Sequence, residues 1–261
     1  MTTILDADFY KLRHNIGFKL LPLVVIAWSI ITSCFMLFIE NGATVEGEYF
    51  TNADVFGFMP AGYLGAHVLS TVSNVYSMVI IVFCGLFIST EFTQGTIRNA
   101  ICAGVSRAKM YVSKLVVCAA MLAFCMLVSV VAFIAGFTVL YGFGDGTGFF
   151  RDTATVFVMQ FLYHLTYAGI GCLLSFLIPN IAFSVAAGMV VVILEGVLVE
   201  ICTAFDALNG IAPLIPQYYV TRLNDNLGNF GFLVSGILVS IVFILITVVI
   251  GCMAFRRQDI K

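Results

Sequence analysis

Six long apolar stretches constrain the fold of this 261-residue chain more than any other feature. They lie at about residues 20–39, 62–88, 112–140, 155–178, 181–204 and 232–255. Each can cross a bilayer, since a spanning helix needs roughly 20 mainly apolar residues. Only 10% of the residues are charged, whereas a soluble domain carries roughly 25%. The sequence therefore predicts an all-α integral membrane protein, with six transmembrane helices in one domain over residues 1–261.

Residues 4–18 predict one further helix, which precedes the first apolar stretch. Its apolar side chains recur every three or four residues and share one helical face: Leu5, Phe9, Leu12, Ile16 and Leu20. Acidic residues come early and basic ones late, which suits the helix dipole. We expect an amphipathic helix lying in the membrane interface. A disordered polar tail is the alternative.

The basic residues predict the orientation of the chain. Ten of the 12 Lys and Arg residues fall in the N-terminal segment, the 89–114 region and the C-terminal tail. The positive-inside rule then places both termini and the loop 89–111 in the cytoplasm, with the chain in the cell membrane. On the other side, the loop 204–231 contains Pro213 and Pro216, and we expect it to fold back as short, re-entrant-like helices. Pro179-Asn180 predicts a tight hairpin between the fourth and fifth spans.

Several kinds of chemistry have no sequence signature here. The chain contains no phosphate-binding Gly-x-x-x-x-Gly-Lys motif, no His-Glu-x-x-His motif and no Gly-x-Ser-x-Gly motif. Its eight cysteines form no Cys-x-x-Cys pair and no zinc-like spacing. We interpret the cysteines as small apolar side chains, and expect this chain to hold no metal or cofactor of its own.

The loop 89–111 is a polar and basic interruption between the second and third spans. We expect a short helix from about Thr93 to Ala103, with Gly104 as its stop and Ser106 as the N-cap of the next helix. Ile97 and Ile101 are four residues apart and predict a small apolar knob. Arg98 and Asn99 flank that knob with hydrogen-bond donors, as a docking contact requires.

This loop resembles the first cytoplasmic loop of ABC-2 type transporter permeases, which have a type V exporter-like architecture. The likeness rests on Glu91-Phe92, on Gly95-Thr96-Ile97-Arg98-Asn99, on Gly104-Val105-Ser106-Arg107, and on Tyr111 with Ser113-Lys114. It extends to the N-terminal helix, the six spans and the last outer loop.

The resemblance implies a role for the loop and a set of partners. In that family the loop is a coupling helix that docks onto a separate ABC ATP-binding subunit. The expected partners are two copies of that subunit, which would hold the ATP and Mg, a second permease that is identical or homologous, and lipid, but no nucleic acid. The candidate docking residues are Glu91, Phe92, Thr96, Ile97, Arg98, Asn99, Ile101, Gly104, Ser106 and Arg107.

Polar side chains also recur inside the second, fourth and fifth spans. Such residues must face the protein interior or a water path. The candidates for a transport path are His67, Ser70, Asn74, Ser77, Gln160, His164, Tyr167 and Glu195. Interhelical hydrogen bonding without a role in transport is the alternative for all of them. Glu200 lies nearer the outer end of its span, and we expect it in the headgroup region.

These observations favour the membrane subunit of an ATP-driven exporter, without an ATPase site of its own. The resemblance suggests a hydrophobic or amphipathic substrate, such as an antimicrobial peptide, a toxin peptide or a drug. An ion-coupled carrier or channel that acts alone is one alternative. An intramembrane glutamate protease is another, prompted by Glu195 and Glu200, but its Glu-Glu-x-x-x-Arg pattern is missing.

Overall fold

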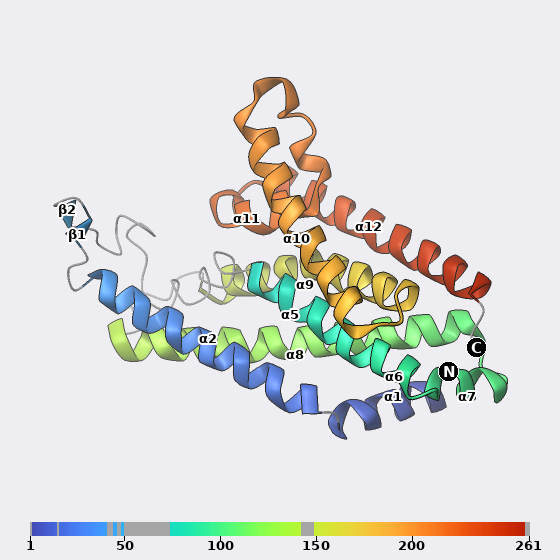
Figure 1. The fold of residues 1–261 in the computed structure, drawn as a ribbon. Coiled ribbons are helices and arrows are strands. Elements are labelled where there is room, and N and C mark those ends of the chain that lie inside the picture. Colours follow the sequence, from blue (N-terminus) through green and yellow to red (C-terminus); the bar gives the residue numbers. More distant parts are fainter. Residues whose placement is uncertain are drawn as a thin grey trace.

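The computed structural model is almost entirely helical, which confirms the predicted all-α membrane fold (Figure 1). It describes residues 2–14, 16–40, 44–45, 48–49, 74–141 and 149–258. Within these residues the main helices are α1 (Thr2–His14), α2 (Ile16–Glu40), α5 (Asn74–Cys84), α6 (Thr90–Thr93), α7 (Thr96–Cys102), α8 (Arg107–Tyr141), α9 (Phe149–Leu177), α10 (Ile181–Ala204), α11 (Pro216–Arg222) and α12 (Phe230–Arg257). A two-residue antiparallel pair, β1 (Thr44–Val45) with β2 (Glu48–Tyr49), follows α2.

Five helical segments of the described chain are long and apolar enough to cross a membrane: residues 75–93, 107–139, 149–177, 181–204 and 230–257. Residues 4–14 and 19–32 form a sixth candidate, bent by 58° between its two parts. Five predicted spans correspond to α2, α8, α9, α10 and α12. The second predicted span corresponds to α5 and its continuation, and its residues 62–73 lie outside the described part of the chain.

Several helix ends differ from the predicted ones. Helix α8 begins at Arg107 rather than at about residue 112, and α9 begins at Phe149 rather than at about residue 155. The charged first turns of both helices have helical backbone outside the apolar stretch, and an apolar-length criterion misses such turns. The hairpin at Pro179-Asn180 is confirmed, because the Asn180 side chain accepts a hydrogen bond from the Phe183 N–H and caps α10.

Helix α9 is the centre of the bundle (Figure 1). It packs against α5, α8, α10, α11 and α12, while α2 packs along α8. The loop 204–231 forms the short helices η2 (Asp206–Leu208), η3 (Ala212–Leu214), α11 and η4 (Asn224–Asn226), as the sequence predicts. Helix α11 turns back against α9, so the loop adds side chains to the bundle core.

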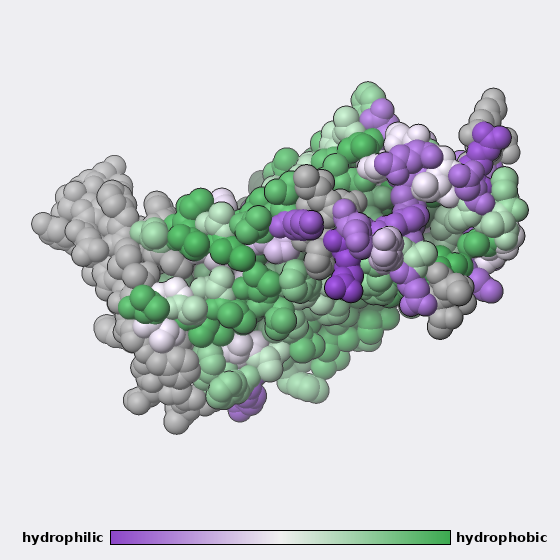
Figure 2. Space-filling view, turned by 90° about the horizontal axis from the view of Figure 1, so that it is seen from below, coloured by the Kyte–Doolittle hydropathy of each residue, from purple (hydrophilic) through white to green (hydrophobic). Residues whose placement is uncertain are grey.

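The two ends of the bundle differ in character. Both termini lie at the same end as α1, α6 and α7, which we name the α7 end (Figure 1). Hydrophilic side chains gather mostly over this end, whereas apolar side chains cover the middle of the bundle (Figure 2). The helices α10 and α12 expose much of their apolar surface, since only 17% of each best apolar window is buried.

Candidate functional site

The segment between the second and third spans folds as two short helices joined by a glycine turn. Helix α6 ends at Thr93, Gly95 has a φ of +68°, and α7 then runs from Thr96 to Cys102. The predicted single helix from Thr93 was therefore wrong at its start, because the left-handed Gly95 interrupts it. Its predicted stop is confirmed, because Gly104 has a φ of +86° directly after the helix.

The predicted apolar knob on α7 is wrong, since its isoleucines point inward. Ile97 is only 1% exposed and belongs to the hydrophobic core, and Ile101 is half-buried against that core. They anchor α7 to the bundle. The surface of the segment is instead polar, because Arg98, Asn99 and Ser106 are exposed.

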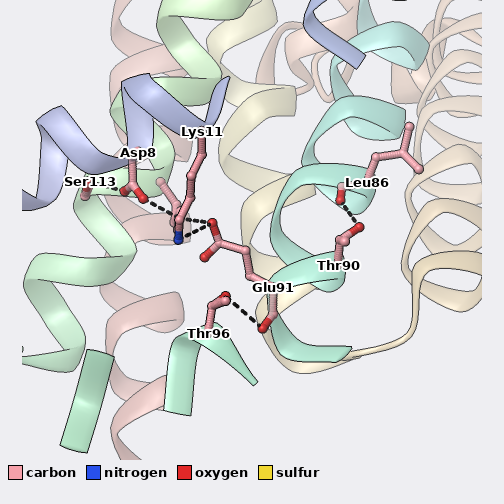
Figure 3. A network of polar contacts seen from close by, with 8 residues as sticks. Asp8, Lys11, Leu86, Thr90, Glu91, Thr96 and Ser113 are labelled. Carbon is pink, nitrogen blue, oxygen red and sulfur yellow. Dashed lines mark hydrogen bonds and ion pairs between the residues drawn. The ribbon is translucent and has the colours of Figure 1, made fainter. Parts of the chain in front are cut away.

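Glu91 is a second predicted docking residue that the structure buries, at 6% exposure. Its Oε1 lies 2.7 Å from the Lys114 Nζ on α8 and 3.3 Å from the Lys11 Nζ on α1. The Lys114 Nζ also lies 2.6 Å from the Asp8 Oδ1, and the Ser113 hydroxyl donates to the Asp8 Oδ2 at 2.6 Å. We call Asp8, Lys11, Glu91, Ser113 and Lys114 the lysine network (Figure 3).

The lysine network joins three elements that are distant in sequence: α1, α6 and the start of α8. Lys114 is 2% exposed and Asp8 is 4% exposed. The Lys114 ammonium is therefore stabilised by the Asp8 and Glu91 carboxylates, and Asp8 depends on Lys114 as its cation. The Lys114 ammonium also lies 4.7 Å from the centre of the Phe87 ring. The Thr96 hydroxyl donates to the Glu91 carbonyl oxygen at 3.2 Å, which connects α7 to the same network.

Sequence reasoning missed the lysine network, in which Lys114 and Lys11 pair with Glu91 while Asp8 pairs with Lys114 and accepts from Ser113. The available signal was Lys114 itself, an ionisable residue inside the third apolar stretch, where an unpaired charge costs several kcal/mol. The α1 helix was predicted, and it forms. Its Leu12 faces the core, and Asp8, one turn earlier on the same face of the helix, is buried as well. The helix thus docks onto the bundle through charges as well as apolar contacts.

Arg107 is half-buried and binds the end of α12. Its Nη1 lies 2.9, 2.8 and 2.7 Å from the carbonyl oxygens of Phe255, Arg256 and Gln258. These carbonyls lie at the C-terminus of α12, where backbone acceptors lack helical partners and a cation is favourable. Phe92 is also turned inward, with its ring edge-on to Phe176 and Phe255. Both side chains therefore serve the internal packing of the α7 end.

A hollow of about 270 Å³ lies between α1 and α6 at the α7 end. Tyr10, His14, Thr90 and Gln94 line it, and Lys11 and Glu91 of the lysine network border it. The hollow and the exposed polar side chains of α7 lie at the same end of the bundle (Figure 1). Together they give the α7 end a recessed, polar surface.

The predicted transport-path residues are only partly placed. His67 and Ser70 lie outside the described residues, and of Asn74 only the backbone is described, at the start of α5. Ser77 is fully buried. On α9, Gln160, His164 and Tyr167 are all fully buried. The prediction that polar side chains face the protein interior is confirmed for these four residues.

The structure brings the predicted Tyr167 and Glu195 together with Gln217, which sequence reasoning missed. The Tyr167 oxygen lies 2.8 Å from the Glu195 Oε2 and 2.6 Å from the Gln217 Oε1. A phenol has a single proton, so it donates to one oxygen only; the Gln217 amide, turned by 180°, donates to the phenol instead. We call these three residues the tyrosine cluster. It joins α9, α10 and α11.

A hollow of about 470 Å³ lies beside the tyrosine cluster. Its lining is mainly apolar and includes Met78, Val192 and Gly196, while Gln217 adds a polar side chain. Glu200 is exposed and also lines this hollow. Gln217 is therefore the side chain that belongs both to the hollow and to the tyrosine cluster.

Comparison with known proteins identifies the family of this chain. Residues 4–195, well over half of the chain, match the family model described as ABC-2 family transporter protein. A search of curated proteins found no match. The matched region includes α1, the α6–α7 segment and the first part of the tyrosine cluster. The chain therefore belongs to the ABC-2 transporter family and is a multi-pass membrane permease subunit of an ABC transporter.

Proposed function

We propose that this permease works as the membrane subunit of an ATP-driven exporter. Its substrate would be a hydrophobic or amphipathic molecule, such as an antimicrobial peptide, a toxin peptide or a drug. The observation that carries this proposal is the polar α7 end, in which a short helix between two spans is anchored to the core and presents polar side chains outward. ABC-2 family membership adds the expectation of an ABC ATP-binding subunit as partner.

The exposed face of α7 is the contact surface that we propose for that partner. Arg98 and Asn99 are exposed there, as is Ser106 just after the helix. The hollow between α1 and α6 lies at the same end of the bundle. Charged and polar rims set the register and the partner choice of such contacts. The proposed assembly has two copies of the ATP-binding subunit, which supply ATP and Mg, and has the α7 end in the cytoplasm.

The anchoring of α7 provides a route for movement from partner to membrane. Ile97 inserts into the core, and Thr96 binds the Glu91 carbonyl. Glu91 in turn pairs with Lys114, near the start of α8. A displacement of α7 therefore acts on the second and third spans together, and through Asp8 on α1.

The apolar faces of α10 and α12 are the surfaces that we propose for a second permease, identical or homologous, and for lipid. Exposed side chains on them include Leu194, Leu198, Leu238 and Leu245. The hollow of about 470 Å³ between α5, α10 and α11 opens beside the apolar face of α10. We propose this hollow and the tyrosine cluster as part of the substrate path, because an apolar lining with few polar groups suits an amphipathic molecule.

A co-purification tests the proposal. The affinity-tagged chain is extracted in mild detergent from the membranes of cells that naturally make it, and its partners are identified by mass spectrometry. We expect an ABC ATP-binding subunit and ATPase activity with the wild type, and a loss of both with Arg98→Glu. Lys19→Glu, an exposed charge reversal on α2, is the matched control and should retain both.

A folded wild-type chain without any ATP-binding subunit would overturn the proposal. So would Arg98→Glu and Lys19→Glu chains that bind the subunit equally well, which would move the contact away from α7. An isolated chain that transports on its own would favour the ion-coupled carrier or channel.

A further inference from the structure

Three cysteines that are far apart in sequence meet in the core of the bundle. Cys84 ends α5, Cys118 lies in α8 and Cys172 lies in α9, and each is 0% exposed. Their three sulfur atoms all lie within 4.8 Å of one another, and the Cys84 and Cys172 sulfurs are 3.9 Å apart. Sequence spacing gave no sign of this cluster, because each helix contributes one thiol.

The backbone around the cysteine cluster is shaped to bring the sulfurs together. Residues Gly85–Ser89 form a π-helix directly after Cys84, and such segments are rare and occur frequently at functional sites. A Cβ at position 171 would lie 3.0 Å from the Cys84 Cβ and 3.2 Å from its sulfur. Gly171 thus permits an approach of α5 to α9 that a larger residue would hinder.

We propose that Cys84, Cys118 and Cys172 form a binding site for a soft monovalent metal ion, Cu(I). Thiolate sulfur is a soft ligand that favours Cu(I), Zn²⁺ and iron–sulfur clusters over hard cations. With metal–sulfur bonds of about 2.3 Å, a trigonal site places its sulfurs about 4 Å apart. The observed separations of 3.9 Å and up to 4.8 Å need only a small inward movement of the thiols.

The number of ligands favours Cu(I) over Zn²⁺. Metal ligation by cysteine requires thiolates and releases their protons, and three thiolates complete a trigonal Cu(I) site. Zn²⁺ brings two charges and prefers four ligands, whereas the cluster offers three sulfurs among the described residues. The nearest network charge on α8, Lys114, lies one turn before Cys118 and is already paired with Asp8 and Glu91.

A bound ion would connect α5, α8 and α9 through three coordinate bonds. Binding to the folded state alone raises stability in proportion to the logarithm of free ligand over Kd. Cu(I) should therefore raise the thermal unfolding midpoint of the protein, independently of any partner subunit or transport activity.

Metal loading of the full chain tests the site. The protein is purified in detergent with Cys34→Ser and Cys102→Ser, which removes the two thiols that are exposed. It is loaded anaerobically with Cu(I) and passed over a Cu(I) chelator, and the retained metal is measured by mass spectrometry. We expect about one Cu(I) per chain, sulfur-to-metal ultraviolet absorption and a raised unfolding midpoint.

Variants identify the ligands. Cys118→Ala and Cys172→Ser should each weaken Cu(I) retention at least about tenfold. Even the replacement of a residue that only contacts a metal ligand typically lowers metal affinity by about that factor. Cys125→Ala removes a buried thiol of the same helix outside the cluster and should retain Cu(I). The midpoint of each metal-free variant shows that it is folded. The proposal would be overturned if the folded Cys34→Ser/Cys102→Ser protein retained no Cu(I), or retained Zn²⁺ instead. It would also be overturned if the folded protein with Cys118→Ala and Cys172→Ser added still kept Cu(I).

Discussion

The lysine network and the tyrosine cluster hold charge inside the same bundle in different ways. In the lysine network a buried ammonium lies between two buried carboxylates, 2.6 and 2.7 Å away, and a second ammonium borders them. In the tyrosine cluster Glu195 accepts from a phenol, and no Lys, Arg or His among the described residues forms an ion pair with it. Each arrangement joins three elements, but the first does so through buried ion pairs, whereas the second does so through hydrogen bonds that can be exchanged.

Replacement of Lys114 should have the largest effect on the fold. Lys114→Met leaves Asp8 and Glu91 buried without their shared cation, which costs about 3–5 kcal/mol when one partner of a buried pair is lost. We expect a large drop in the yield of folded protein and in its thermal midpoint in detergent. Lys109→Met, an exposed change on the same helix, should leave both unchanged.

A triple variant separates the two possible causes of the Lys114 effect, charge pairing and packing of the lysine stem. Asp8→Asn together with Glu91→Gln removes the uncompensated charges, so the triple variant should recover part of the lost midpoint. A triple variant that is no more stable than Lys114→Met alone would show that packing of the lysine stem, and not charge pairing, dominates.

The tyrosine cluster should be less important for folding. Tyr167→Phe removes the hydroxyl that binds Glu195 and Gln217 while it keeps the ring, and leaving such groups unsatisfied costs about 1–3 kcal/mol. We expect a smaller midpoint change than for Lys114→Met and a larger relative change in transport. Tyr163→Phe on the same helix, whose buried hydroxyl has no hydrogen-bond partner among the described residues, is the control and should change neither. A Tyr167→Phe midpoint as low as that of Lys114→Met would remove the distinction between the two regions.

Loss of Arg107 should have a local effect at the α7 end. Arg107→Gln shortens the side chain away from three carbonyls at the end of α12, and each lost hydrogen bond is worth roughly 1 kcal/mol. We expect faster hydrogen exchange in residues 252–258, with exchange in α9 unchanged. Lys109→Gln is the matched change. Equal exchange at 252–258 in both variants would contradict the capping role.

The smallest effect is expected at the glycine that ends α7. Gly104→Ala places a Cβ on a left-handed backbone, which costs roughly 1–2 kcal/mol, while the surrounding space is open. We expect a slightly lower midpoint and weaker binding of a partner at α7. Ala103→Gly, in ordinary backbone geometry, should not reproduce the loss of binding.

The sequence predicted the parts of this fold that follow from apolar length. Five apolar stretches became helices, since a bilayer imposes helix length directly. The Pro179-Asn180 hairpin was predictable for a different reason, because Pro ends a helix and Asn suits a turn. Residues in contact across helices were not predictable in the same way. Asp8 and Lys114 are 106 positions apart, and nothing local in either helix specifies the other.

The inward direction of Ile97 shows the same limit at the candidate site. A four-residue spacing identifies an apolar face, but it does not state whether that face meets the core or a partner. Gly95 contributes to the outcome, because its left-handed turn sets the direction of α7 relative to α6. Gln217 was missed for a related reason: the loop was expected to fold back, but nothing local in it shows which side chain reaches the core.

Site-specific photocrosslinking is the sharpest test of α7 as the contact surface for an ABC ATP-binding subunit. A photoreactive amino acid replaces Arg98 on α7 or Phe150, an 83% exposed residue at the start of α9, and cells that make the chain are irradiated. If α7 binds the partner, position 98 should give a covalent adduct with an ABC ATP-binding subunit and position 150 should give none. An adduct from position 150 alone, or no such adduct from position 98 in a correctly inserted chain, would contradict it.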